Sequence, residues 1–179
     1  MKSLNEWLRH IEKLHPKSWD LGLTRIKEVA AKLGLKEDSS KVFLVAGTNG
    51  KGSTCEFIEQ FCIEAGYSVG KSTSPHLFRF NERIQVDGSE VPDEEIVKAF
   101  EAIELSRGNI SLTYFEFAAL ASVLIFSRRA LDVWVLEVGL GGRLDAMNIF
   151  QRDVTVITQI ALDHQAWLGS NREEIGIEK

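Results

Sequence analysis

The sequence predicts an α/β fold of three layers, in which a doubly wound, mostly parallel sheet carries a phosphate-binding loop. Short runs of apolar, often β-branched residues alternate with longer segments of helical periodicity, and this order of elements is typical of a doubly wound sheet. One loop, GTNGKGS at 47–53, lies between an apolar run and a helical segment. We expect a single domain of this type, incomplete at its C-terminal side, over residues 1–179.

Composition excludes several classes of function. The net charge of −5, without a basic cluster, argues against nucleic acid as the main partner. The most apolar stretch, 115–126, contains Glu116 and is too short to span a bilayer, so no membrane role is expected. Cys55 and Cys62 have the spacing of small buried groups on one helix face and fit a reducing cytoplasm.

Capping patterns and periodicity place the elements. Ser3 with Glu6, and Thr113 with Glu116, form capping boxes, and helical periodicity covers 4–14, 24–33, the segment from the loop to about 65, and segments beginning at 93, 113 and 171. In the helix after the loop, one apolar face is expected to consist of Phe57, Ile58, Phe61 and Cys62. Strands are expected at 42–46, 67–72, 84–86, 132–138 and 154–157, with a hairpin turn at Asp87-Gly88.

The glycine-rich loop at 47–53 predicts a nucleotide site. Its three glycines allow the backbone to turn sharply, so that several N–H groups can point at phosphate oxygens. Lys51 would add positive charge at the β- and γ-phosphates, and Ser53 or Thr54 would offer a hydroxyl to a magnesium ion. The spacing differs from the commoner GxxxxGK[ST] loop. The alternative is a strand-to-helix turn whose lysine faces solvent.

Polar residues that follow the other strands are further candidates, because ligands of open α/β sheets gather beyond the carboxyl ends of the strands. Glu137, near the end of an apolar strand, needs a cation or hydrogen bonds, which predicts a metal ligand; the alternative is an ion pair with Arg143 or another basic group. His164 follows Asp163 at another strand end, and a lone histidine is more often structural than a ligand. Ser74 precedes a proline and is a weak candidate alone.

Taken together, these segments resemble the folylpolyglutamate synthases of the Mur ligase superfamily, in particular the bifunctional dihydrofolate synthase/folylpolyglutamate synthases. The matching segments are DLGLTRI (20–26), VAGTNGKGSTC (45–55), SPHL (74–77), NERI (81–84), SLTYFEF (111–117), LEVGLGGRLDAMN (136–148), LDH (162–164) and WLG (167–169). Met147 and Gln159 depart from the family pattern, which puts substrate detail in doubt more than reaction class.

The resemblance implies a role for each matching position. ATP phosphates would be bound by Thr48, Asn49, Gly50, Lys51, Gly52 and Ser53. One Mg²⁺ would be held by Ser74 and Glu137, and a second by Glu137, His164 and Lys179 as a carbamate; Lys51, Glu137, His164 and Lys179 would be the catalytic set. The pterin or pteroate pocket would consist of Ser18, Trp19, Asp20, Leu21, Thr113, Tyr114, Phe115, Glu116, Leu144, Asp145 and Ala146.

The implied reaction uses ATP to join L-glutamate to dihydropteroate or to folates through an acyl phosphate. The implied full-length enzyme is a cytoplasmic monomer, longer than this chain, so residues 1–179 would be the N-terminal part of its ATP-binding domain. We therefore expect a truncated fragment with little or no ligase activity. Two alternatives are a non-catalytic nucleotide-binding module and a Mur-type ligase acting on a cell-wall precursor. The segments LTYFEF and DLGL favour folate.

Overall fold

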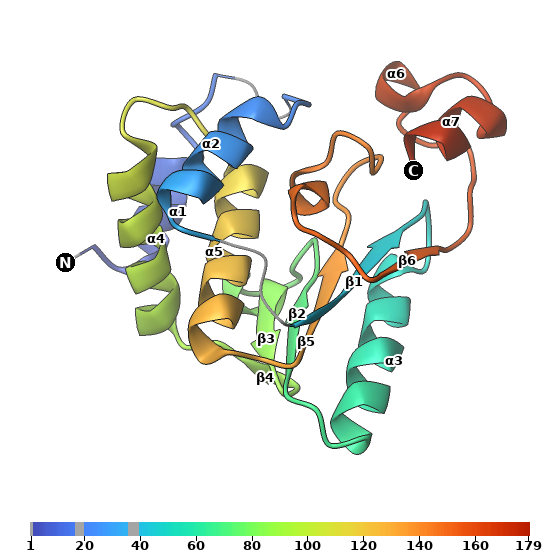
Figure 1. Cartoon of the computed structure of the whole chain (residues 1–179). Coiled ribbons are helices and arrows are strands. Elements are labelled where there is room, and N and C mark those ends of the chain that lie inside the picture. The colour runs from blue at the N-terminus through green and yellow to red at the C-terminus, as the bar shows by residue number, and fades with distance from the viewer. Residues whose placement is uncertain (1, 17–19, 36–39) are drawn as a thin grey trace.

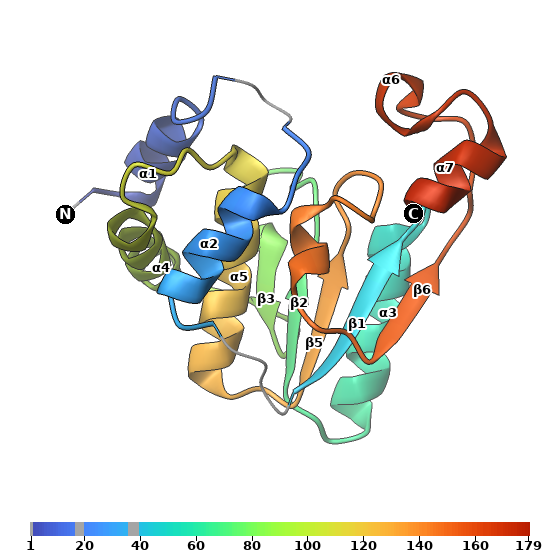
Figure 2. The same ribbon diagram turned by 45° about the horizontal axis from the view of Figure 1, so that its top comes forward.

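A mostly parallel sheet forms the centre of the molecule (Figures 1 and 2). The structure is a computed structural model that describes residues 2–16, 20–35 and 40–179. In this part of the chain six strands are arranged in the order β4-β3-β2-β5-β1-β6. They are β1 (Lys41–Ala46), β2 (Val69–Ser72), β3 (Ile84–Val86), β4 (Ser89–Glu90), β5 (Val133–Glu137) and β6 (Val154–Ile157). Strands β2, β5, β1 and β6 are parallel, and the β3-β4 hairpin adds antiparallel strands at one edge.

Helices cover both faces of the sheet, which confirms the three-layer, doubly wound arrangement. On one face lie α1 (Leu4–Ile11), α2 (Thr24–Lys32), α4 (Asp93–Arg107) and α5 (Tyr114–Arg129), which share one large apolar core with the sheet. The opposite face is covered by α3 (Lys51–Glu64), with a smaller core of its own. Two short helices, α6 (Gln165–Leu168) and α7 (Arg172–Glu178), lie beyond the carboxyl end of β6.

Local signals in the sequence proved reliable for helix starts and for the hairpin. Both predicted capping boxes form, at the start of α1 and of α5, and the Asn171 side chain accepts the Glu174 N–H at the start of α7. The β3-β4 turn uses Asp87 and Gly88 with φ of 50° and 72°, as a tight hairpin requires. None of the described helices is long and apolar enough to cross a membrane.

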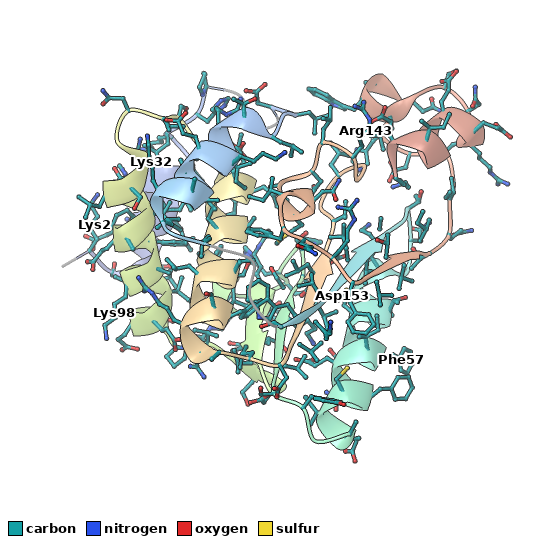
Figure 3. All side chains as sticks on the ribbon, in the orientation of Figure 1. Lys2, Lys32, Phe57, Lys98, Arg143 and Asp153 are labelled. Atoms are coloured by element: carbon teal, nitrogen blue, oxygen red, sulfur yellow. The ribbon has the colours of Figure 1, made fainter. Side chains whose placement is uncertain are left out.

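The expected apolar face of α3 is wrong in part. Phe57 and Phe61 are 63% and 71% exposed, and the Phe57 ring points away from the sheet (Figure 3). Helix α3 instead packs on the sheet through Cys55 and Glu59, which are fully buried, while Cys62 is only half-buried. The burial of Glu59 is possible because the Lys71 ammonium on β2 lies 2.5 Å from its carboxylate.

Candidate functional site

The strand order brings the predicted loop and two other strand ends to one edge of the sheet. Because β1 lies between β5 and β6, the loop after β1 is flanked by the residues that follow both neighbours. The segment after β6 is fastened to the loop. The Thr48 N–H donates to the Gln159 carbonyl over 2.7 Å, and the Thr158 hydroxyl donates to the Asn49 carbonyl over 2.8 Å. The Thr48 hydroxyl in turn accepts the Ala161 N–H at 3.0 Å.

The loop 47–53 leaves open space above the start of α3. Gly50, with φ of +83°, precedes the first residue of this 14-residue helix, and no side chain caps the helix there. A Cβ added at Gly50 or Gly52 would meet nothing within 4 Å. The exposed N–H groups of a helix start and a glycine turn together favour an anion. This geometry fits the phosphate site that the sequence predicts.

Lys51 turns back over its own loop, which argues against the alternative of a lysine that merely faces solvent. Its ammonium donates to the Thr48 carbonyl over 3.3 Å and is partly buried. The Thr54 hydroxyl is engaged inside the helix, where it donates to the Gly50 carbonyl over 2.8 Å, whereas the Ser53 side chain is exposed. Of the two hydroxyls considered for a metal ion, that of Ser53 is therefore the accessible one.

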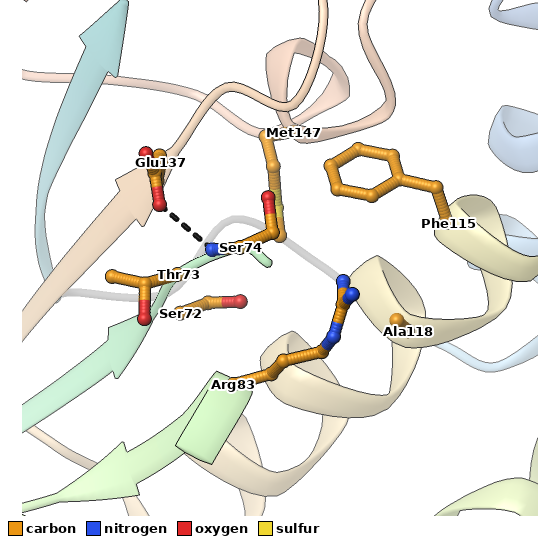
Figure 4. A pocket seen from close by; sticks show the side chains of 8 residues that line it. All are labelled: Ser72, Thr73, Ser74, Arg83, Phe115, Ala118, Glu137 and Met147. Atoms are coloured by element: carbon orange, nitrogen blue, oxygen red, sulfur yellow. Dashed lines mark hydrogen bonds between the residues drawn. The ribbon is translucent and has the colours of Figure 1, made fainter. Parts of the chain in front are cut away.

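Glu137 ends β5 and is only 4% exposed. One of its carboxylate oxygens accepts the Ser74 N–H at 2.7 Å, and Figure 4 shows this contact at the rim of a pocket. Burial raises the pKa of Glu137, and the Ser74 N–H and the Lys51 charge act in the opposite direction. Of the alternative pairings, that with Arg143 is wrong, because the Arg143 guanidinium pairs with Glu178 at 2.9 Å. Glu137 forms no ion pair with another basic group among the described residues, although the charges of Lys51 and Arg83 act on it.

The other proposed metal ligands lie on the segments after β6. The His164 side chain is about half-exposed, with its ring 3.6 Å from the Asp163 carboxylate. Lys179, at the end of α7, donates from its ammonium to the Gly47 carbonyl over 2.8 Å. Burial and then the Lys51 charge lower the pKa of Lys179. Within the described ranges, no three His, Cys, Asp or Glu side chains gather into a group suited to a metal ion.

Most of the residues assigned to the substrate pocket line one cavity beside the start of α5. Its lining consists of Asp20, Leu21, Gly22, Thr113, Phe115, Glu116, Leu140, Leu144, Asp145 and Ala146. Tyr114 is not part of this lining and lies 5.6 Å from the Arg83 guanidinium, measured to its ring centre. Ser18 and Trp19 lie outside the described residues.

The buried side chain of Asp145 forms hydrogen bonds with the backbone of a segment that lines this cavity. Its buried carboxylate accepts the backbone N–H groups of Gly139, Leu140 and Met147 at 3.1, 3.0 and 2.9 Å. Burial raises the pKa of Asp145 to about 6, although these hydrogen bonds favour the ionised form. The segment 139–147 is thus fixed by one carboxylate.

Arg25 joins two acidic residues of the cavity and was not assigned a role from the sequence. Its guanidinium lies 2.5 Å from the Asp20 carboxylate and 3.1 Å from that of Glu116. It also donates to the Asp20 carbonyl over 3.0 Å. Arg25 belongs to DLGLTRI, one of the segments that resemble the family.

A second pocket adjoins the first, and Phe115 contributes to the walls of both. Figure 4 shows this second pocket between Glu137 and Ser74 on one side and Arg83 on the other. Its full lining is Ser72, Thr73, Ser74, Arg83, Phe115, Ala118, Glu137 and Met147. Arg83 is a further residue that the sequence reasoning missed, although it belongs to the matching segment NERI.

The fold and the loop together define an α/β protein with a phosphate-type glycine loop at the carboxyl edge of its sheet. No protein-family model matches the chain. The dihydrofolate synthase/folylpolyglutamate synthase of Escherichia coli (strain K12) is 53% identical over 176 residues, which are 98% of this chain and 42% of that protein.

Two solved structures have the same fold. E. coli FolC in complex with DHPP and ADP gives a TM-score of 0.96 at 52% identity, covering 99% of this chain and 43% of that one. A bifunctional folylpolyglutamate synthase/dihydrofolate synthase with Mn, AMPPNP and L-glutamate bound gives 0.92 at 50% identity, with 99% and 43% covered. The chain therefore belongs to the dihydrofolate synthase/folylpolyglutamate synthase family and corresponds to its N-terminal portion. It spans about 42% of the length of these relatives.

Proposed function

We propose that residues 1–179 form the N-terminal part of the ATP-binding domain of a ligase that adds L-glutamate to dihydropteroate, to folates, or to both. The observation that carries the proposal is the open glycine loop at the start of α3, with the Lys51 ammonium folded over it and Glu137 ending the neighbouring strand. The complexes of relatives with DHPP and ADP, and with AMPPNP and L-glutamate, support the same reading. Because these relatives are folate enzymes, we favour folate over a cell-wall precursor.

In the proposed reaction the substrate carboxylate attacks the γ-phosphorus of ATP, and ADP leaves, so that an acyl phosphate forms. The amine of L-glutamate then attacks the acyl carbon and displaces phosphate. The backbone N–H groups of Asn49 to Ser53 and the Lys51 ammonium would hold the phosphates and offset charge on the transferred group. The cavity around Asp145 would hold the pterin. Neither step needs a nucleophile from the protein.

The residues present fit a hard divalent cation beside this loop. Glu137 keeps a carboxylate oxygen at the rim of the second pocket, next to Ser74, and oxygen atoms are the ligands that Mg²⁺ prefers. We propose that Ser74 and Glu137 hold one Mg²⁺, and that Glu137, His164 and the carbamate of Lys179 hold another. Bound cations would neutralise the phosphate charge. The lowered pKa of Lys179 favours its neutral amine, which is the form that reacts with carbon dioxide.

The nucleotide site can be tested by titrating Mg-ATP into the 179-residue chain and into Lys51→Ala. Removal of the ammonium should weaken binding about 10-fold or more, since a charge-assisted contact contributes about 1.5–3 kcal/mol. The matched control is Lys41→Ala, at the opposite end of β1, where the exposed Lys41 pairs with Asp153. Equal heats for the chain and for Lys51→Ala, or no heat for either, would contradict the proposal.

We further propose that turnover needs more polypeptide than these residues, because the chain spans about 42% of its relatives. Little or no glutamate should be joined to dihydropteroate by the 179-residue chain in an assay with Mg-ATP. Measurable synthesis of dihydrofolate by this chain would refute that statement.

A further inference from the structure

The Arg83 guanidinium points into the pocket that contains Glu137. Arg83 ends the short 3₁₀ helix Phe80–Arg83, directly before β3, and Figure 4 shows its guanidinium near Ala118 and Phe115, on the side of the pocket opposite Glu137. Its Nε donates to Nδ1 of His76 over 2.7 Å. Within the described residues this is the one hydrogen bond of the guanidinium, and neither terminal nitrogen forms one.

Two aromatic rings fix the direction of the side chain. The guanidinium carbon lies 5.9 Å from the centre of the Phe80 ring and 5.6 Å from that of Tyr114. Phe80 is itself fully buried and packs edge-on against Tyr114 and Phe100. A guanidinium held in this way loses little further side-chain entropy when it binds a ligand.

Arg83 forms no ion pair with a carboxylate in the described part of the chain, although the charges of Glu137 and Glu82 act on it. Five other arginines, namely Arg25, Arg79, Arg107, Arg129 and Arg143, form ion pairs with carboxylates. Arg83 forms none there, although it is largely enclosed, and burial lowers its pKa. A partly buried cation that forms no ion pair is costly, and an anionic ligand in the pocket would reduce that cost.

We propose that Arg83 binds the carboxylate of the pteroate or folate substrate, the group that accepts the phosphoryl group from ATP. This assignment rests on the proposed function. Phe115 lines both the cavity around Asp145 and the pocket of Arg83, so a substrate whose pterin lies in the first would have its acidic end near the second. Glu137, the proposed metal ligand, lines that same pocket, which brings the acidic end beside the phosphates.

The position gives Arg83 a clear chemical task. A carboxylate that approaches a triphosphate is repelled by it, and a guanidinium beside the carboxylate offsets that repulsion. The two terminal nitrogens can accept both carboxylate oxygens in a fork or hold one oxygen toward the γ-phosphorus. The competing role is structural, in which Arg83 only orders the loop before it through the bond to His76.

The test compares two ligands, dihydropteroate and its carboxamide, which keeps the pterin and benzoyl parts but has no charge. Affinities are measured by fluorescence titration with the 179-residue chain and with R83Q, R83K and R79Q. Arg79 is the matched control, because it is exposed and pairs with Glu90 and Asp93 on the surface. We expect R83Q to bind dihydropteroate about 10- to 100-fold more weakly and the carboxamide equally well. R83K should recover part of the loss, and R79Q should change neither affinity.

The outcomes separate this assignment from the proposed function. Equal binding of dihydropteroate by the wild-type chain and R83Q overturns the role of Arg83 alone. If R83Q loses equal affinity for the acid and for the carboxamide, Arg83 only orders the loop, and its assignment to the substrate carboxylate is overturned as well. Binding of neither ligand by the wild-type chain overturns the proposed function, and the assignment with it. If R83Q does not fold, the wild-type preference for the acid over the carboxamide and the R83K affinities decide the matter.

Discussion

Gly47 is the loop position at which a single methyl group should do most harm. Its φ of +144° is rarely adopted by other residues, and a Cβ there would lie 1.8 Å from the Thr158 hydroxyl oxygen. Since real Cβ contacts essentially never fall below 3.0 Å, Thr158 has to move by about 1.2 Å, the difference between 3.0 and 1.8 Å. That movement breaks its hydrogen bonds to the carbonyls of Ala46 and Asn49, at 3.2 and 2.8 Å.

The magnitude follows from these two effects. Backbone strain costs about 1–3 kcal/mol, and the lost hydrogen bonds add about 0.5–1.5 kcal/mol. Gly47→Ala should therefore lower the free energy of unfolding by about 2–4 kcal/mol, measured by urea unfolding followed by circular dichroism. The control is Gly52→Ala, because a Cβ there meets nothing within 4 Å.

A double-mutant cycle separates the clash from the strain. Thr158→Ala removes the oxygen that the new methyl group would strike, so the double variant should lose about 0.5–1.5 kcal/mol less than the sum of the two single variants. Strictly additive losses, or a change of less than about 0.5 kcal/mol for Gly47→Ala alone, would refute the reasoning.

Two further predictions concern the cavity around Asp145. Arg25→Ala removes the ion pairs with Asp20 and Glu116, so calorimetry should show that dihydropteroate binds about 10-fold more weakly and that Mg-ATP binding is unchanged. The control is Lys27→Ala, because Lys27 is exposed on the same helix. Unaltered affinity for dihydropteroate would exclude a positioning role for Arg25. For Asp145 the folded-state pKa is about 6 against an ordinary 3.8, so the folded protein holds the proton more tightly and stability is lost as pH rises through this window. The free energy of unfolding of the wild-type chain, relative to Asp145→Asn, should thus fall by up to about 3 kcal/mol between pH 4 and pH 7. Urea unfolding at several pH values measures this difference. A difference that does not change with pH would contradict the raised pKa.

Features encoded by neighbouring residues could be predicted from the sequence. The glycine loop, the capping boxes and the Asp87-Gly88 turn depend on residues within a few positions of one another, and each occurs where expected. Alternation of strand and helix segments was sufficient for the fold class. The placement of β1 between β5 and β6 then gathers the strand ends at one edge.

Features that join distant segments could not be predicted in this way. The inward face of α3 depends on Glu59 meeting Lys71, and the apolar pattern alone favoured Phe57 and Phe61. The contact between Arg25 and Glu116 joins residues 91 positions apart. Such ion pairs depend on how the layers pack, and nothing in the local pattern of charges specifies them.

The position of the Phe115 ring, which lines both pockets, is fixed by its contact with the backbone. The ring lies directly on the backbone of Gly139, where an added Cβ would fall 2.6 Å from it, so its position is set by main chain and not by adaptable side chains. A ligand that occupied both pockets would have to pass this ring, which has no room to move toward Gly139.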